Sequence, residues 1–147
     1  MALNLSFSGA GFMGIYHVGV ASCLKVHGQD FLKSVDRFSG SSAGSMVACC
    51  LLCDTGLEQS VEFIMGLASK ATGNLLGPLS PSFDPASTVR EVFMKHLPPD
   101  AYQLATGRLF ISLTRVEDMK NVVVSEFGSN KELVDVSMNV LFKEPSD

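Results

Sequence analysis

The sequence predicts an α/β fold, a three-layer α/β/α domain in which helices pack on a mainly parallel sheet. Within the first 52 residues, a strand, a glycine-containing loop and a helix follow one another twice, as in parallel α/β folds. Hydrophobic residues make up 46% of the 147 residues and charged residues 18%, which excludes a disordered chain. The mean hydropathy of +0.27 is high for a chain of this length and agrees with a buried parallel sheet.

The first strand–loop–helix unit opens the chain. Residues 3–8 are predicted to form a strand, and a helix is expected from about Phe12 to His27. The loop that joins them consists of Gly9, Ala10, Gly11, Phe12, Met13 and Gly14. The N–H groups of such a loop can hold a pyrophosphate at a helix N-terminus. They can equally stabilise the oxyanion that forms when a serine attacks an ester.

The second unit carries a candidate nucleophile. Residues 35–39 alternate like a short strand, and the apolar run 46–52 predicts a helix. Between them stand Gly40, Ser41, Ser42, Ala43 and Gly44. This G-x-S-x-G pattern between a strand and a helix is typical of a nucleophile elbow, in which a strained turn exposes the central serine above the sheet.

The second unit also decides between the two uses of the first loop. A dinucleotide site calls for an acidic residue about 20 positions after the glycines, at the end of the second strand. Here the second strand ends at Ser39 and Gly40, while Asp36 lies within it and Asp30 lies before it. We favour the oxyanion interpretation because one residue pattern then explains both loops. A dinucleotide site remains an alternative, which titration with nicotinamide or flavin cofactors would test.

The middle of the chain is predicted to be scaffold. A capping box at residues 55–58 begins a helix. The apolar stripe of that helix consists of Val61, Ile64, Met65 and Ala68. Residues 73–85, rich in Gly, Ser and Pro, form either an acyl-chain entrance or a surface connection. A helix capped by Asp84, with Pro85 at its first position, is expected to end at His96.

The last third is predicted to contain two strands and two helices. A short helix capped by Asp100 closes at Gly107. Strands 108–115 and 121–127 are joined by the polar turn 117–120. A capping box at residues 129–132 begins the last helix. One side of this helix is expected to carry Leu133, Val136, Val140 and Leu141.

The cysteines suggest a metal or redox site only weakly. Cys50 and Cys53 have C-x-x-C spacing, but no second Cys/His pair follows that could complete a zinc site. We therefore expect Cys23, Cys49 and their neighbours to act as small apolar residues in a reducing compartment, without disulfides.

A Ser–acid–His triad is a second weak hypothesis. Ser42, then Asp54 or Asp84, then His96 match the chain order of α/β-hydrolases. However, His96 stands at the end of its predicted helix, where a basic residue usually serves the helix terminus. We expect it and the other two histidines to be structural.

Charge and hydropathy restrict partners and location. The formal net charge of −4, without a local Lys/Arg cluster, argues against nucleic-acid binding. No basic segment precedes the apolar start, so no signal peptide is expected and the location should be cytoplasmic. Residues 5–24 are apolar enough to be flagged as a membrane span, but the strand–loop–helix pattern accounts for them better. No cofactor or metal is expected.

The two glycine loops, at this spacing, resemble the patatin-like phospholipase family. Residues 11–21, 76–83 and 107–116 are similar to the branch of that family that contains adipose triglyceride lipase and adiponutrin. The resemblance extends from about Leu3 to Val136. We therefore expect residues 1–136 to be the N-terminal part of a patatin-like domain and residues 137–147 to be an unmatched tail.

The resemblance implies a serine acyl hydrolase with a Ser–Asp dyad, active on triacylglycerol or other acylglycerolipids in lipid catabolism. Ser42 matches the nucleophile, and the loop of residues 9–14 matches the oxyanion hole. The resemblance also implies work at a lipid-droplet or membrane surface and a protein co-activator as in related lipases. The family's aspartate lies in an Asp-Gly motif, and the sequence contains no Asp-Gly pair. No catalytic aspartate can be assigned.

We therefore expect a C-terminally truncated domain that is inactive on its own, such as a splice form or a partial product. The rival hypothesis is a non-catalytic fragment that binds a lipid droplet or a partner protein. Substitution of Ser42 by Ala separates the two, because a binding role would not depend on the hydroxyl.

Overall fold

The structure is a computed structural model that describes residues 2–55, 57–58, 85–139 and 141–142. Its sheet contains β1 (Leu3–Phe7), β2 (Val35–Gly40), β3 (Leu109–Arg115), β4 (Asn121–Val124) and β5 (Leu141–Phe142). The strand order is β1-β2-β3-β4, with β5 paired to β3. Strands β1, β2, β3 and β5 are joined by parallel pairings, and only β4 is antiparallel to its neighbour. The predicted α/β fold with a mainly parallel sheet is confirmed.

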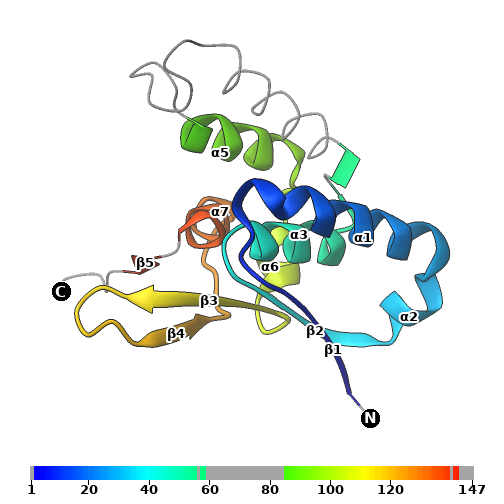
Figure 1. Ribbon diagram of the computed structural model, residues 1–147, viewed down its shortest axis with the longest axis horizontal. Coiled ribbons are helices and arrows are strands. Elements are labelled where there is room, and N and C mark those ends of the chain that lie inside the picture. Colours follow the sequence, from blue (N-terminus) through cyan, green and yellow to red (C-terminus); the bar gives the residue numbers. More distant parts are fainter. Residues whose placement is uncertain (1, 56, 59–84, 140, 143–147) are drawn as a thin grey trace.

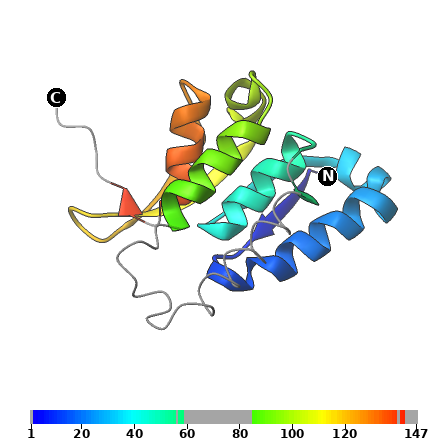
Figure 2. The same ribbon diagram turned by 90° about the horizontal axis from the view of Figure 1, so that it is seen from above.

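A layer of helices covers one face of the sheet (Figure 1). The helices are η1 (Gly11–Met13), α1 (Gly14–His27), α2 (Gln29–Lys33), α3 (Ala43–Leu52), α5 (Pro85–His96), α6 (Ala101–Ala105) and α7 (Asn130–Met138). Helices α1, α3 and α7 lie side by side on one face of the sheet, with α5 beyond them (Figures 1 and 2). None of the helices within the described ranges is long and apolar enough to cross a membrane.

The core lies between this helical layer and the sheet. In β3, Leu109 and Ile111 are fully buried toward the helices, while Ser112 on the alternate face is half-buried. In β1, Asn4 and Ser6 are exposed. Helix α3 is central, because it contacts α1, α7 and three strands, and seven of its ten residues are buried. Position and orientation of the α3 N-terminus are therefore set by contacts on several sides.

Several predicted boundaries differ from the structure. Strand β4 ends at Val124, not at Phe127, and α7 ends at Met138 because Asn139 turns to extended backbone. Leu141 therefore does not lie on that helix: it belongs to β5, where pairing with β3 satisfies its backbone groups. Of the segment from 55 to 85, the structure describes only Thr55, residues 57–58 and the start of α5. The predicted apolar stripe 61–68 lies outside the described residues, and so does the predicted connection 73–85 except for its last residue.

The N-cap of α6 differs from the sequence prediction, whereas that of α7 agrees with it. Asp100 stands at the N-cap of α6 as predicted, but its side chain makes no capping hydrogen bond. The N–H of Tyr102 instead donates to Asn130 Oδ1 at 2.9 Å, so a residue at the start of α7 caps α6. At α7 the predicted N-cap bond is present: Glu132 N donates to Ser129 Oγ at 3.2 Å. The Glu132 carboxylate accepts from the N–H of Gly128, one residue before the N-cap, rather than from that of Ser129.

Candidate active site

The corner between β2 and α3 holds Ser42 in a strained backbone conformation. Its φ is 51° and its ψ is −128°, a region that only glycine adopts readily. Helix α3 starts immediately after it, and the N–H groups of Ser45 and Met46 both donate to the Ser42 carbonyl, at 2.9 and 3.3 Å. The first turn of the helix therefore fixes the peptide that carries the candidate nucleophile.

Two glycines allow this corner to pack without side chains. A Cβ at Gly40 would lie 2.4 Å from the backbone nitrogen of Ser45. A Cβ at Gly44 would lie 2.4 Å from the carbonyl oxygens of both Phe7 and Ser8. Real Cβ contacts are essentially never so short, so α3 can approach β2 only because Gly40 lacks a side chain, and the end of β1 only because Gly44 lacks one. This is the physical reason for the two glycines of the G-x-S-x-G frame.

The loop after β1 lies directly against this corner. A Cβ at Gly9 would lie 3.8 Å from the Cβ of Ser42, and a Cβ at Gly14 would lie 3.1 Å from that of Ala43. The N–H of Ser41 donates to the carbonyl of Phe7 at 3.3 Å, which joins the ends of β2 and β1. The structure thus brings together the two predicted loops, residues 9–14 and 40–44. Their catalytic roles remain proposals.

Within the first loop, two N–H groups are already engaged. Met13 N donates to Ala10 O at 2.9 Å and Gly14 N donates to Gly11 O, which closes the turn η1. Gly11 itself has a φ of 51°, which a glycine adopts without strain. The N–H groups that precede Met13 are therefore better candidates for an incoming oxyanion. The N-terminus of α3, beside Ser42, adds the positive end of a helix dipole.

Two contacts around the corner were missed from the sequence. The Nε2 atom of His17 lies 2.9 Å from Ser8 O, and its ring packs edge-on against Phe7 with centroids 5.5 Å apart. This contact ties α1 to the start of the glycine loop. The Oγ of the fully buried Ser45 lies 2.6 Å from Ser42 O and 2.8 Å from Ser137 O, which ties α7 to the corner. No local spacing indicated these contacts, because both residues bind groups on other elements of the fold.

The triad hypothesis is not supported by the geometry. Thr55 Oγ1 donates to His96 O at 2.7 Å, so the end of α5 lies beside the C-terminal end of α3. Ser42 precedes the opposite end of that ten-residue helix, about 15 Å away at 1.5 Å per residue. The His96 ring is bonded to Val92 O of its own helix at 2.8 Å, in the structural role expected. Asp54 pairs with Lys25 at 2.8 Å at the same far end, and Asp84 lies outside the described residues.

Comparisons with known proteins identify the family of the chain. A family model described as patatin-like phospholipase matches residues 5–139. Patatin-like phospholipase domain-containing protein 2 of Bos taurus is 42% identical over 135 residues, which cover 92% of this chain and 28% of that protein. A human protein named 1-acylglycerol-3-phosphate O-acyltransferase is 40% identical over 132 residues, covering 90% of this chain and 27% of its own length.

A third relative, the human omega-hydroxyceramide transacylase, is 36% identical over 132 residues, 90% of this chain and 25% of that protein. The chain thus spans between 25% and 28% of the length of these three relatives. No solved structure matches the chain significantly. The family model covers most of the chain, including both glycine loops and the strained serine, and the chain therefore belongs to the patatin-like phospholipase family.

Proposed function

We propose that Ser42 is the nucleophile of an acyl-transfer reaction on ester bonds of acylglycerolipids, with triacylglycerol as the reference substrate, in lipid catabolism. The observation that carries this proposal is the strained conformation of Ser42, at φ 51° and ψ −128°, beside a glycine loop in which a Cβ added at Gly9 would lie 3.8 Å from the Ser42 Cβ. Strain of this kind costs about 1–3 kcal/mol and is retained mainly where function requires it. Membership of the patatin-like family supports the same reaction class.

The reaction would run in two steps. The Ser42 oxygen forms a bond to the ester carbonyl carbon while its proton passes to a base, and the negative charge moves to the carbonyl oxygen. N–H groups of Gly9 to Phe12, together with the α3 N-terminus, would stabilise that oxyanion. Collapse breaks the bond to the glyceryl oxygen, which takes the proton from the base and leaves as an alcohol, while the acyl group stays on Ser42. Water or another alcohol then takes the acyl group.

The base is the open part of this mechanism. We propose the family's Ser–Asp dyad, yet no aspartate in the sequence lies in an Asp-Gly pair. A serine site without its base typically loses about 10⁴-fold or more in turnover. We therefore expect this chain alone to turn over esters very slowly, while Ser42 can still react with a strongly electrophilic probe.

The surface beside the site supports contact with a lipid droplet or membrane. Met13, Tyr16 and Val20 are exposed along one side of η1 and α1, beginning within the glycine loop itself. No Asp, Glu, Lys or Arg occurs from Gly14 to Leu24. An uncharged apolar stripe that begins at an ester-binding loop suits a lipid–water interface, where tyrosine is also favoured.

A fluorophosphonate, a strongly electrophilic probe that phosphonylates nucleophilic serines, tests the proposal. Wild type should be labelled at Ser42, and Ser42→Ala should not be labelled. Ser6→Ala, which removes an exposed serine from β1, is the matched control and should be labelled like wild type. Folding of each protein is checked by circular dichroism. Absence of labelling in folded wild type would contradict a nucleophilic role for Ser42 in this chain.

The second candidate function is a lipid- or partner-binding fragment without catalysis. It is favoured by the lack of an Asp-Gly pair together with the exposed residues on α1. Flotation with triacylglycerol emulsions distinguishes the two functions. Binding that is equal for wild type and Ser42→Ala, without probe labelling, would support the binding function. Loss of binding in Tyr16→Glu would assign the contact to α1.

A further inference from the structure

The side chain of His17 extends from α1 to the peptide that opens the glycine loop. Its Nε2 atom lies 2.9 Å from the carbonyl oxygen of Ser8. Its half-buried ring packs edge-on against Phe7, with 5.5 Å between the ring centroids. Because a carbonyl oxygen only accepts, Nε2 carries the hydrogen and donates it. A residue one turn into α1 therefore holds the last carbonyl before Gly9.

The start of α3 confines the same carbonyl from a second side. A Cβ added at Gly44 would lie 2.4 Å from Ser8 O, so this glycine of α3 lies directly against the oxygen. Gly9, the next residue, lies against the nucleophile corner, where an added Cβ would be 3.8 Å from that of Ser42. The peptide between Ser8 and Gly9 is thus held by two helices at the point where the loop meets the candidate nucleophile.

A fixed Ser8 carbonyl also fixes the direction of the Gly9 N–H. Both groups belong to one planar trans peptide, so the C=O and the N–H point in opposite directions. Without this restraint, a glycine in a loop has wide freedom to turn the peptide. No backbone carbonyl in the described ranges accepts a hydrogen bond from the Gly9 N–H. This N–H is therefore an available donor whose direction depends on His17.

We propose that His17 is a positioning residue for acyl transfer at Ser42. Its Nε2–H holds the Ser8 carbonyl so that the Gly9 N–H points at the oxyanion that forms on the ester. A donor that is aimed before the charge develops needs no reorganisation when it does, which is the source of its effect on rate. The His17 ring keeps its proton and takes no part in the bond changes. This inference rests on the function proposed for Ser42.

The alternative is that His17 acts only by packing its ring against Phe7. The two roles make opposite demands on a substitution. Phenylalanine keeps an aromatic ring but has no donor. Glutamine lacks the ring, but its side-chain N–H reaches about as far as Nε2 of histidine. Asparagine carries the same amide on a side chain that is one methylene shorter, so its N–H falls short of Ser8 O.

The experiment measures the rate of Ser42 phosphonylation by the fluorophosphonate over a range of probe concentrations. Attack by serine places negative charge on the phosphonyl oxygen, so the probe also needs the oxyanion donors. We expect His17→Phe to lower the maximal rate at least about tenfold, since loss of one such donor costs about 10²–10³-fold. The half-saturating concentration should change by less than about twofold, because the charge is absent before attack.

The matched variants separate the hydrogen bond from packing. His17→Gln should react within about threefold of wild type, because it keeps a donor to Ser8. His27→Phe, an exposed position at the end of α1, is the control and should react like wild type. A fast His17→Phe with a slow His17→Gln would show a packing role and overturn the proposal. Should His17→Phe not fold, the amide pair decides: His17→Asn must be slower than His17→Gln, and equal rates would overturn the proposal.

Failure of this inference differs from failure of the proposed function. Equal labelling of wild type and the His17 variants leaves Ser42 as the nucleophile and removes the positioning role. Absence of labelling in folded wild type contradicts both.

The hydrogen bond itself is tested by 15N NMR at about pH 8, where histidine is ordinarily neutral. The hydrogen should lie on Nε2 of His17. In the same spectrum, His96 serves as the reference, with its hydrogen on Nδ1, which bonds Val92 O. A hydrogen on Nδ1 of His17 would overturn the proposal, because Nε2 would then have nothing to donate to Ser8.

Discussion

Of the three described residues other than glycine at positive φ, which are Ser42, Asp54 and Met119, the first and the last lie in turns that are held in different ways. Ser42 has a φ of 51° between β2 and α3, and Met119 has a φ of 57° at the tip of the β3–β4 hairpin. Around Ser42, backbone packs on backbone through Gly40 and Gly44. Around Met119, side chains of the hairpin hold the turn, and the residues of the tip are exposed.

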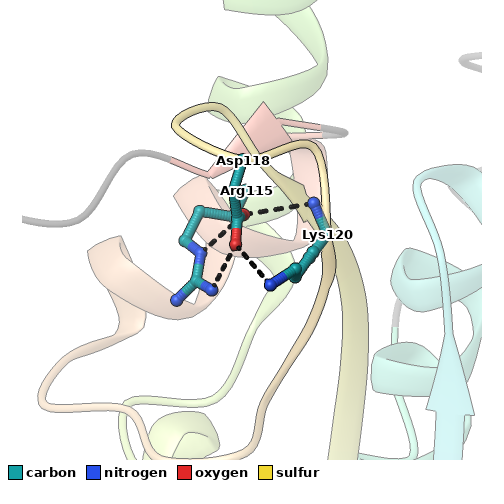
Figure 3. Close-up of polar contacts among 3 residues, drawn as sticks. All are labelled: Arg115, Asp118 and Lys120. Carbon is teal, nitrogen blue, oxygen red and sulfur yellow. Dashed lines mark hydrogen bonds and ion pairs between the residues drawn. The ribbon is translucent and has the colours of Figure 1, made fainter.

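The hairpin turn depends on one carboxylate (Figure 3). Asp118 accepts hydrogen bonds from Arg115 Nε at 2.9 Å and Nη2 at 2.8 Å, and from the backbone N–H of Lys120 at 3.2 Å. Lys120 Nζ is 3.5 Å from the same carboxylate. These contacts, the bond from Arg115 first, lower the pKa of Asp118 to about 2. Water can replace each of them, because the group is exposed.

The comparison shows which surroundings hold a strained backbone conformation firmly. The Ser42 corner cannot relax without moving the end of β1 away from α3, whereas the Met119 turn can exchange its ion pairs for hydration. Exposed ion pairs contribute little to stability, because water and salt screen the charges. A backbone clash in a packed corner costs several times more. A positive φ is therefore held strongly at Ser42 and weakly at Met119.

The largest effect is expected from Gly44→Ala. Its methyl group would lie 2.4 Å from two carbonyl oxygens of β1 and its following residue, so α3 must shift. We expect a loss of about 3 kcal/mol or more, measured by urea unfolding. Gly19→Ala is the control, because nothing lies within 4 Å of its added Cβ on α1. It should stabilise the chain by up to about 1 kcal/mol through helix propensity. Equal effects of the two substitutions would contradict the packing argument.

A smaller loss is expected from Ser45→Ala. The buried hydroxyl bonds the carbonyls of Ser42 and Ser137, and the first of these is also served by backbone N–H groups. We expect a loss of about 1 kcal/mol, the usual net value of one hydrogen bond. Ser112→Ala, which removes a hydroxyl bonded to Asn121 near the surface, should change stability less. If Ser45→Ala is neutral, the contact between α7 and the corner does not hold it.

Glycine substitutions measure the strain itself. Ser42→Gly should stabilise the chain by about 1 kcal/mol, because relief of strain exceeds the added entropy of the unfolded chain. Met119→Gly should stabilise it less, since left-handed backbone costs an ordinary residue only about 1 kcal/mol. Both effects are read from urea midpoints. Destabilisation by Ser42→Gly would mean that its side chain contributes contacts worth more than the strain.

The smallest effect concerns the pH dependence of the hairpin. Because the pKa of Asp118 is lowered from 3.8 to about 2, its contribution is fully present above pH 4 and is lost as the pH falls through about 2. A carboxyl NMR titration should give a midpoint near 2. In Arg115→Gln the midpoint should rise toward 3.8, because the largest cause of the shift is removed. An unchanged midpoint would show that Lys120 alone holds the carboxylate.

Local sequence patterns predicted much of the fold, including the strand and the helix on either side of Ser42. The alternation of residues 35–39 and the run 46–52 predicted β2 and α3 within a few residues. The capping box at residues 129–132 predicted the start of α7. The end of α7 was mispredicted, because the residues beyond Met138 are drawn into pairing with β3. That pairing is non-local and leaves no periodic signal.

The sequence by itself determined the two glycine loops, their order and the serine between Gly40 and Gly44, because tight backbone approach requires glycine at defined positions. Only the tertiary structure decided what meets at the corner. It brought Gly9 against Ser42, tied the loop to α1 through His17, and joined α7 to the corner through Ser45. It also placed His96 beside the C-terminal end of α3, at the opposite end of that helix from Ser42, so the two cannot form a triad. Contacts between residues distant in the chain depend on how whole elements pack, and no local spacing encodes them.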